Sequence, residues 1–383
     1  MVPVLAKITN IIGVIFGLFA LLGMTGQAWT ADSGKTEWER TVEAARKEGQ
    51  VNVYIGGWGA VLESGVFEQS YPGIKVVAVA GRGGETAKRI LAERRAGKFI
   101  ADVSSEGVGS NYRTLHAANS FDPIKPVLLL PEVTDESRWW QGKHRYVDPE
   151  GKFVFRYVGL PQTGNISYNS TLVNPKEIKS IWDFLLPKWK GKILARDIRS
   201  PGPGNAPMRF FYHHPAIGSV FIKRLFGEMD VTLFRDFRQS VDWLAGGKFS
   251  ICFFCSDIDK AKLQGLSVDE FAVVLKEGAA LHTQYGTLGL LNQAPNPNAA
   301  KVFINWFLSR EGQSTLQKTL SKSAEEAPDS FRIDIPKDDV KPVNRRVEGV
   351  QYLDLDSRPE WMEMKPIILV FEEALAEAGK QKK

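Results

Sequence analysis

The chain has 383 residues, of which 43% are hydrophobic and 24% charged, with 35 glycines and 20 prolines. Ordinary globular proteins have these proportions, so a disordered, collagen-like or polytopic membrane protein is excluded. At roughly 150 residues per domain, the length predicts two lobes or domains, each with its own core. The net charge is +5, from 49 Lys+Arg and 44 Asp+Glu, and no run of five like charges occurs, so we expect no nucleic-acid partner.

The N-terminus has the three regions of a secretory signal peptide. Lys7 precedes an apolar stretch over residues 11–24, and Gly26 and Ala28 are small residues at −3 and −1 of a cleavage point. The apolar stretch is shorter than the roughly 20 residues that a membrane-spanning helix needs. We therefore predict a signal peptide over residues 1–28, cleaved near Ala28, and a soluble mature protein in the periplasm. A retained N-terminal anchor is the alternative.

Strands alternate with helices over the first half of the mature chain. A capping box formed by Thr36 and Glu39 opens a helix that ends at Gly49. The strands predicted next are residues 51–55, 74–80 and 101–103, and the helices are residues 61–71, a segment around Ile90 and Leu91, and a stretch that ends at Leu115. This alternation predicts an α/β lobe with a largely parallel sheet.

A second run of the same kind starts near Ile166. Its predicted strands are residues 166–169, 192–196 and 249–254, and its predicted helices are residues 217–226 and 236–244. Phe303 and Phe307 lie on a strongly amphipathic helix. After Ser321 the composition becomes polar and Pro-rich, and residues 361–378 predict a last docking helix. The chain therefore carries two α/β units and a tail.

Four loops rich in Gly, Ser and Arg follow the predicted strands. In open α/β sheets, ligands bind beyond the carboxyl ends of the strands, where backbone N–H groups at helix N-termini meet an anion or a polar group. The loops are residues 56–59, 81–85, 104–109 and 200–205. The candidate ligand-binding residues in or beside them are Trp58, Arg82, Glu85, Ser104, Ser105, Arg199, Ser200, Gly202, Gly204 and Asn205.

Several of these candidates have a structural alternative. Trp58 either stacks on a planar or sugar-like group or covers the core. Arg82 stands between glycines at a strand–helix turn, where it either grips a carboxylate or phosphate or is a solvated helix-start residue. Arg196 and Asp197 are expected to pair with each other, which makes Arg199 the better ligand candidate. The glycines around Arg82 lack the spacing of a nucleotide fingerprint, so we expect no cofactor.

Three segments carry a family resemblance: residues 67–76 (FEQSYPGIKV), 183–192 (DFLLPKWKGK) and 298–313 (NAAKVFINWFLSREGQ). They resemble the solute-binding proteins of ABC importers, in the ferric iron, thiamine and polyamine branch of the type II periplasmic binding proteins. The resemblance spans most of residues 36–320 and covers the tail poorly. It implies a monomeric protein that is not an enzyme and that delivers a captured solute to an inner-membrane ABC permease. A secreted enzyme is the alternative of another class.

The resemblance also implies a two-lobed α/β clamshell whose chain crosses the hinge twice. The crossings are expected near residues 166–169 and 284–288. One lobe would then hold residues 36–167 with 285–320. The other would hold residues 168–284 with the tail, residues 321–383.

The solute is not fixed by the resemblance. Ferric-binding relatives coordinate iron through adjacent tyrosines, where this chain has Cys255 and Ser256, and through a His that Trp58 replaces. Glu106 alone cannot replace that cage, so no metal site is expected. The loop over residues 200–205 instead matches the anion-contact loop of those relatives. We therefore expect a small organic or anion-bearing solute, with Ser256 among the ligand-binding residues, and ferric iron held by non-standard ligands as the alternative.

Cys252 and Cys255 form a C-x-x-C pattern in a chain predicted to enter an oxidising compartment. Cys252 falls within a predicted strand, and side chains three apart on a strand face opposite sides. We therefore expect two buried, apolar thiols. A local disulfide, which needs an intervening turn, and a redox-active pair are the alternatives.

Overall fold

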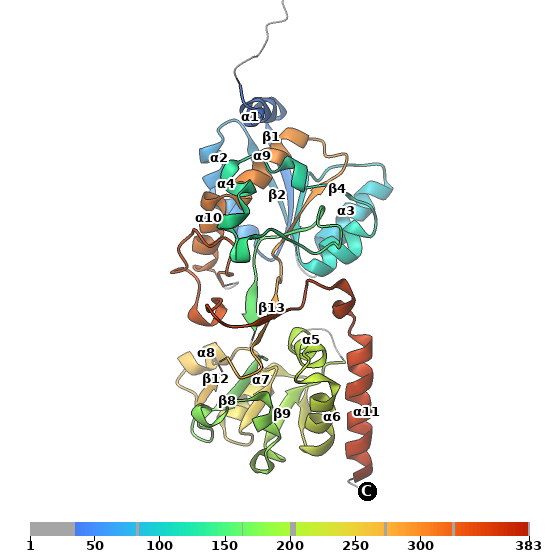
Figure 1. Ribbon diagram of the computed structural model, residues 1–383, viewed down its shortest axis with the longest axis vertical. Helices are drawn as coiled ribbons and strands as arrows, with labels where there is room; N and C mark the ends of the chain where they lie inside the picture. The colour runs from blue at the N-terminus through green and yellow to red at the C-terminus, as the bar shows by residue number, and fades with distance from the viewer. Residues whose placement is uncertain are drawn as a thin grey trace, which may run out of the picture. The chain divides into compact units, whose positions relative to one another are not determined.

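The computed structural model describes residues 35–81, 84–162, 164–199, 204–271, 274–323 and 326–381. Residues 36–383 form one compact unit (Figure 1). The predicted signal peptide, residues 1–28, lies outside the described residues. Among the described residues, no helix is both long and apolar enough to cross a membrane.

The first sheet has seven strands in the order β2-β1-β3-β14-β6-β5, with β4 paired to β14. Its first three members are parallel, and β14 runs antiparallel to β3. The strands are β1 (Gln50–Gly56), β2 (Lys75–Gly81), β3 (Val103–Glu106), β4 (Phe121–Asp122), β5 (Arg145–Tyr146), β6 (Phe155–Arg156) and β14 (Thr287–Leu291). The accompanying α-helices are α1 (Glu37–Glu48), α2 (Val66–Ser70), α3 (Glu85–Arg95), α4 (Pro131–Thr134), α9 (Pro297–Leu308) and α10 (Arg310–Leu320). Shorter helical turns are η1 (Gly59–Ser64), η2 (Gly109–His116), η3 (Lys125–Val127), η4 (Glu136–Arg138) and η5 (Trp140–Gly142).

The second sheet has five strands in the order β10-β9-β11-β8-β12. β9 is parallel to β10 and β11, whereas β8 is antiparallel to both of its neighbours. The strands are β8 (Ile166–Asn169), β9 (Ile193–Arg196), β10 (Thr232–Phe234), β11 (Ile251–Phe253) and β12 (Val268–Glu270). The helices are α5 (Asn205–His213), α6 (Gly218–Glu228), α7 (Phe237–Ala245) and α8 (Ile258–Leu263), with turns η6 (Pro175–Glu177), η7 (Ile181–Leu185) and η8 (Pro187–Trp189).

A third sheet, β15-β13-β7, lies on the path between the other two. The chain leaves the first sheet at β6, passes through β7 (Leu160–Gln162) into β8, and returns through β13 (Ala279–His282) into β14. β7 and β13 are antiparallel, and β15 (Tyr352–Asp354), from the tail, pairs in parallel with β13. The lobe boundaries and hinge positions expected from the sequence stay a prediction. The tail also contains η9 (Pro342–Asn344), η10 (Pro359–Met362) and α11 (Lys365–Gln381).

Two large apolar clusters account for most of the core. The first includes Phe303 and Phe307 of α9, together with Phe331 of the tail. The second gathers side chains of the second sheet and its helices, and it includes Phe371 of α11. α11 lies alongside α6, as predicted for a docking helix (Figure 1). The tail therefore contributes apolar side chains to both clusters.

Several elements differ from the sequence prediction. The helix expected over residues 61–71 is split into η1 and α2 at Gly65, whose φ of 70° is incompatible with a continuous right-handed helix. Ser104 and Ser105 lie inside β3, not in the loop that follows it. The third strand therefore extends further than the predicted residues 101–103.

The expectation of two separate thiols is wrong, because Cys252 and Cys255 form a disulfide. β11 ends at Phe253, and Phe254 has a φ of 68°. This turn breaks the strand alternation that would have placed the two side chains on opposite faces. Both half-cystines are buried.

The Arg156 guanidinium is 1% exposed and joins the first sheet to the tail. It donates two hydrogen bonds to Asp354 of β15, at 2.9 and 2.8 Å, and one to Thr283, which follows β13, at 2.8 Å. A buried cation needs such partners, since an unpaired charge in the interior costs several kcal/mol.

Replacing Asp354 with Ala should therefore lower the free energy of unfolding by about 3–5 kcal/mol, because the Arg156 guanidinium stays buried without its anionic partner. Glu373→Ala, which removes an exposed ion pair with Lys223, is the control and should cost less than about 1 kcal/mol. Chemical denaturation of both variants measures the difference. Equal losses in the two variants would show that the Arg156 pair is not a structural tie.

Candidate functional site

Carboxyl ends of parallel strands meet at one edge of the first sheet. β1 ends at Gly56, β2 at Gly81 and β3 at Glu106. A cavity of about 240 Å³ opens there, lined by Gly57, Gly59, Ala80 and Gly81. A Cβ at Gly56 would overlap the Glu106 carboxyl group, so this approach of backbone to side chain requires glycine. Glycines at the start of two of the predicted loops, Gly57 and Gly81, thus line one cavity.

The Glu106 side chain is the buried carboxyl group of this edge, with 2% of the residue exposed. The Thr86 hydroxyl donates a hydrogen bond to it. Burial raises the pKa of Glu106 to about 8, so the group is largely protonated at neutral pH. A neutral carboxyl in this position can both donate and accept a hydrogen bond.

The predicted serines beside Glu106 serve the internal hydrogen-bond network. Ser104 donates to Asn111 at 2.7 Å, and Ser105 lies 2.9 Å from the Tyr157 hydroxyl. Both serines are buried. Their role as ligand contacts stays a prediction.

Trp58 is 1% exposed and packs edge-on against Tyr157 and Tyr285, with ring centroids 6.2 and 5.8 Å away. Its indole Nε1 is buried and has no hydrogen-bond partner among the described residues. This packing fits the alternative in which Trp58 covers the core. Glu85 is exposed at the start of α3, and Arg82 lies outside the described residues.

At the edge of the second sheet, Arg199 is held by Asp197 at 2.8 and 2.7 Å, and Asp197 also accepts from Arg235. Hydrogen bonds from Arg199 lower the pKa of Asp197 to about 2, despite partial burial. The Arg196 guanidinium lies over the Phe237 ring at 5.0 Å, and its expected pairing with Asp197 stays a prediction. Arg199 is thus engaged in a local ion pair.

The anion-loop candidates are only partly described. Ser200 and Gly202 lie outside the described residues. Gly204 has a φ of 106° and stands at the start of α5, where a side chain would be strained. Asn205 begins α5 with a buried Oδ1 that has no partner among the described residues, and Ser256 is half-buried after β11.

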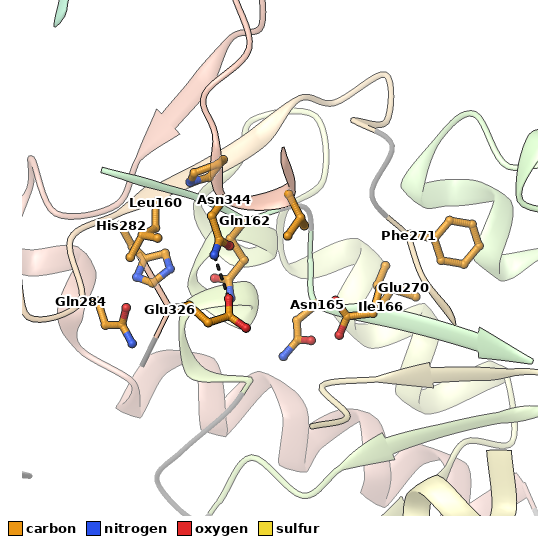
Figure 2. A pocket seen from close by; sticks show the side chains of 12 residues that line it. Leu160, Gln162, Asn165, Ile166, Glu270, Phe271, His282, Gln284, Glu326 and Asn344 are labelled. Atoms are coloured by element: carbon orange, nitrogen blue, oxygen red, sulfur yellow. Dashed lines mark hydrogen bonds between the residues drawn. The ribbon is translucent and has the colours of Figure 1, made fainter. Parts of the chain in front are cut away.

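A larger cavity that the sequence analysis missed, of about 450 Å³, borders the connecting strands β7 and β13 (Figure 2). β12 runs parallel to β11, so its carboxyl end lies at the same edge of the second sheet as the disulfide turn. The cavity is lined by Leu160, Pro161, Gln162, Asn165, Ile166, Glu270, Phe271, His282, Gln284, Glu326, Val343 and Asn344. The missed signal was a carboxylate at the end of the short strand β12, together with polar residues of a tail that no family motif covers.

Two carboxylates of this cavity differ in their surroundings. Glu326 accepts from Lys341 at 2.7 Å and from Asn344 at 2.8 Å. Burial alone would raise the pKa of Glu326, but these hydrogen bonds lower it. Burial, with nearby Asp259 and Glu326, raises the pKa of Glu270 to about 7. Lys341 opposes this rise only through space, because among the described residues it hydrogen-bonds Glu326 and not Glu270.

A second cavity, of about 520 Å³, shares Glu270, Glu326, Val343 and Asn344 with the first. It extends over Asp257 and α8, which follow Cys255 and Ser256 in the chain. Within the described part of the chain, no group of three His, Cys, Asp or Glu side chains is arranged to hold a metal ion.

Comparisons with solved structures identify the fold. FutA2 from Synechocystis PCC6803, without ligand, matches with a TM-score of 0.58 at 15% identity, over 85% of this chain and 98% of that chain. Trichodesmium FutA (IdiA), in complex with iron and citrate, matches with a TM-score of 0.58 at 17% identity, over 85% of this chain and 99% of that chain. The periplasmic binding protein AfuA from Actinobacillus pleuropneumoniae, with bound fructose-6-phosphate, matches with a TM-score of 0.51 at 19% identity, over 86% of this chain and 99% of that chain.

No family model and no curated protein match the sequence. The structural matches show that the chain has the α/β fold of the two-lobed periplasmic binding proteins of ABC importers.

Glu106→Gln should stabilise the protein at alkaline pH and leave it nearly unchanged near pH 5. A carboxyl group whose folded pKa is raised from 4.5 to about 8 contributes stability that is lost as pH rises through that range. The neutral amide of the variant does not ionise, so its free energy of unfolding should exceed that of the parent by about 4 kcal/mol at pH 9. Denaturation of parent and variant between pH 5 and 9 measures it.

The exposed Glu63→Gln is the matched control and should show no gain that grows with pH. A Glu106→Gln protein that is less stable than the parent at pH 9 would mean that Glu106 is ionised and paired in the native state.

Proposed function

We propose that the protein is the periplasmic substrate-binding component of an ABC importer, which captures one small solute and passes it to an inner-membrane permease. The observation that carries the proposal is the cavity of about 450 Å³ at the two strands, β7 and β13, that connect the sheets. A ligand bound there touches the second sheet, the connecting strands and the tail at once. It can therefore favour a closed arrangement over an open one, as hinge-closing binding proteins require.

The predicted signal peptide supports a periplasmic location for the mature chain. The matched structures support a binding role, because AfuA is a periplasmic binding protein with bound fructose-6-phosphate and Trichodesmium FutA is in complex with iron and citrate. We expect the mature protein to act as a monomer and to leave its solute chemically unchanged. A secreted enzyme, the alternative of another class, would consume the solute.

Native mass spectrometry of protein purified without refolding tests the binding role. We expect one co-purified small molecule per chain, released on denaturation and unchanged after long incubation with the native protein, as followed by NMR. Conversion of the molecule into a product would favour the enzyme alternative.

Ferric iron should not give the intense visible colour of phenolate coordination. Cys255 is bonded to Cys252 and Ser256 follows it, so the adjacent tyrosines of iron-binding relatives have no counterpart at this turn. Titration with iron(III) citrate, read by visible absorption, checks this expectation. A salmon-red complex at one iron per chain would contradict it and restore the iron alternative.

A further inference from the structure

The charged side chains that line the cavity of about 450 Å³ are all acidic among the described residues. Its walls contain the carboxyl groups of Glu270 and Glu326 and no Lys or Arg. His282 also lines the cavity, and burial lowers its pKa, so it is neutral at pH 7. The adjoining cavity has five carboxylates, including these two, and only Lys260 and Lys341 to oppose them. Such a lining disfavours an anion and favours a cation.

The two cavity carboxylates are not equivalent. Lys341 bridges Glu326 and Asp259 at 2.7 and 3.2 Å, so Glu326 already has a cationic hydrogen-bond partner. Glu270 has no side-chain hydrogen bond or ion pair within the described part of the chain. On its own strand, Asp269 pairs with Lys262 at 2.7 Å. Glu270 is therefore the carboxylate available to a ligand.

The amide groups of the cavity add an acceptor. The Gln162 Oε1 atom is buried and has no donor among the described residues. Figure 2 shows Gln162 beside Asn344 and Glu326. The dashed line there is the hydrogen bond that Asn344 donates to Glu326. A buried acceptor without a donor costs free energy, which a ligand N–H group can recover.

We propose that this cavity binds an organic solute through an ammonium group, with Glu270 as the charged partner and Gln162 as an additional acceptor. This inference rests on the proposed binding function and names the chemical class of its solute. A compact ammonium has three donors and no acceptor, which matches a wall that offers a carboxylate and an amide oxygen. The cationic group differs from the anion-bearing solute expected from the sequence. The contact loop expected for that solute, residues 200–205, is described only at Gly204 and Asn205.

Residues of the tail help to determine which ligand the cavity binds. Glu326, Val343 and Asn344 belong to the part of the chain that the resemblance covers poorly, yet they form one wall of the cavity. Lys341 fixes Glu326 through the bridge to α8. The tail therefore sets the size and charge of the cavity next to Glu270.

Three probes of equal chain length isolate the charge of the ligand: 1,4-diaminobutane, 1,4-butanediol and succinate. Calorimetric titration at pH 8 should show one diamine bound per chain. The diol should bind at least roughly 10-fold more weakly, and succinate should not bind. A charge-assisted hydrogen bond corresponds to roughly 10- to 150-fold in dissociation constant, so Glu270→Gln should weaken diamine binding by that factor.

Asp269→Asn is the matched control, because it removes a carboxylate from the neighbouring position on the same strand, which faces the other way. Its diamine affinity should stay within about twofold of the parent. Thermal unfolding of both unliganded variants separates a lost contact from a lost fold. A comparable loss of affinity in both variants would overturn the role of Glu270.

The pH dependence gives a second readout of the same carboxylate. The charged groups that influence Glu270 are Asp259 of α8, Glu326 and Lys341 of the tail, and, from the opposite face of its own strand, Asp269. His282 lines the same cavity. Because Glu270 ionises at about pH 7, diamine binding should tighten roughly 10-fold from pH 6 to pH 8, and this gain should shrink in Glu270→Gln.

The outcomes distinguish this inference from the proposed function. Binding of succinate or of iron(III) citrate at one per chain, without diamine binding, overturns the ammonium class and leaves the binding role intact. A diamine that binds parent and Glu270→Gln equally also overturns the assignment, since the charge of Glu270 would then not matter.

Discussion

The buried guanidinium of Arg156 imposes the constraint on which the central part of this structure depends. It lies at the end of β6, almost without exposure to solvent, and its hydrogen-bond donors must be satisfied inside the protein. Asp354 meets two of them and Thr283 a third. One side chain thus links the first sheet, the segment after β13, and the tail.

The tail continues this linkage into the second sheet. Asp356 accepts from the Thr283 backbone at 2.7 Å and from Arg209 of α5 at 3.1 Å. Arg209 also donates to the Leu355 and Trp361 carbonyls. The connecting strands are therefore held by a third strand, and the cavity beside them has a wall that is fixed by ion pairs. If the two sheets move about β7 and β13, the tail segment around β15 must move with them, or its hydrogen bonds must break.

Much of the framework could be predicted from local sequence signals. The capping box at Thr36, the alternation in β1 and β2, and the apolar spacing of α9 each encode their element within a few residues. The cysteine pair could not be predicted, because the bond depends on the φ of Phe254, which a strand pattern does not reveal. Ser104 and Ser105 illustrate the same limit, since their hydrogen bonds to Asn111 and Tyr157 come from remote segments.

Local sequence signals likewise indicated only part of the candidate site. Glycine-rich strand ends indicated the edge of the first sheet, where Gly57 and Gly81 line a cavity. Glu270 and Glu326 were not foreseen, because they are 56 positions apart and only the folded tail brings them to one cavity. A pattern read along the chain cannot show which charges a tail leaves unbalanced.

The central claim is that a small solute closes the molecule about its two connecting strands. Small-angle scattering of the purified protein, with and without the solute that co-purifies, measures this most directly. The account predicts a smaller radius of gyration at saturation, with one solute bound per chain. An unchanged scattering curve at proven saturation would contradict it.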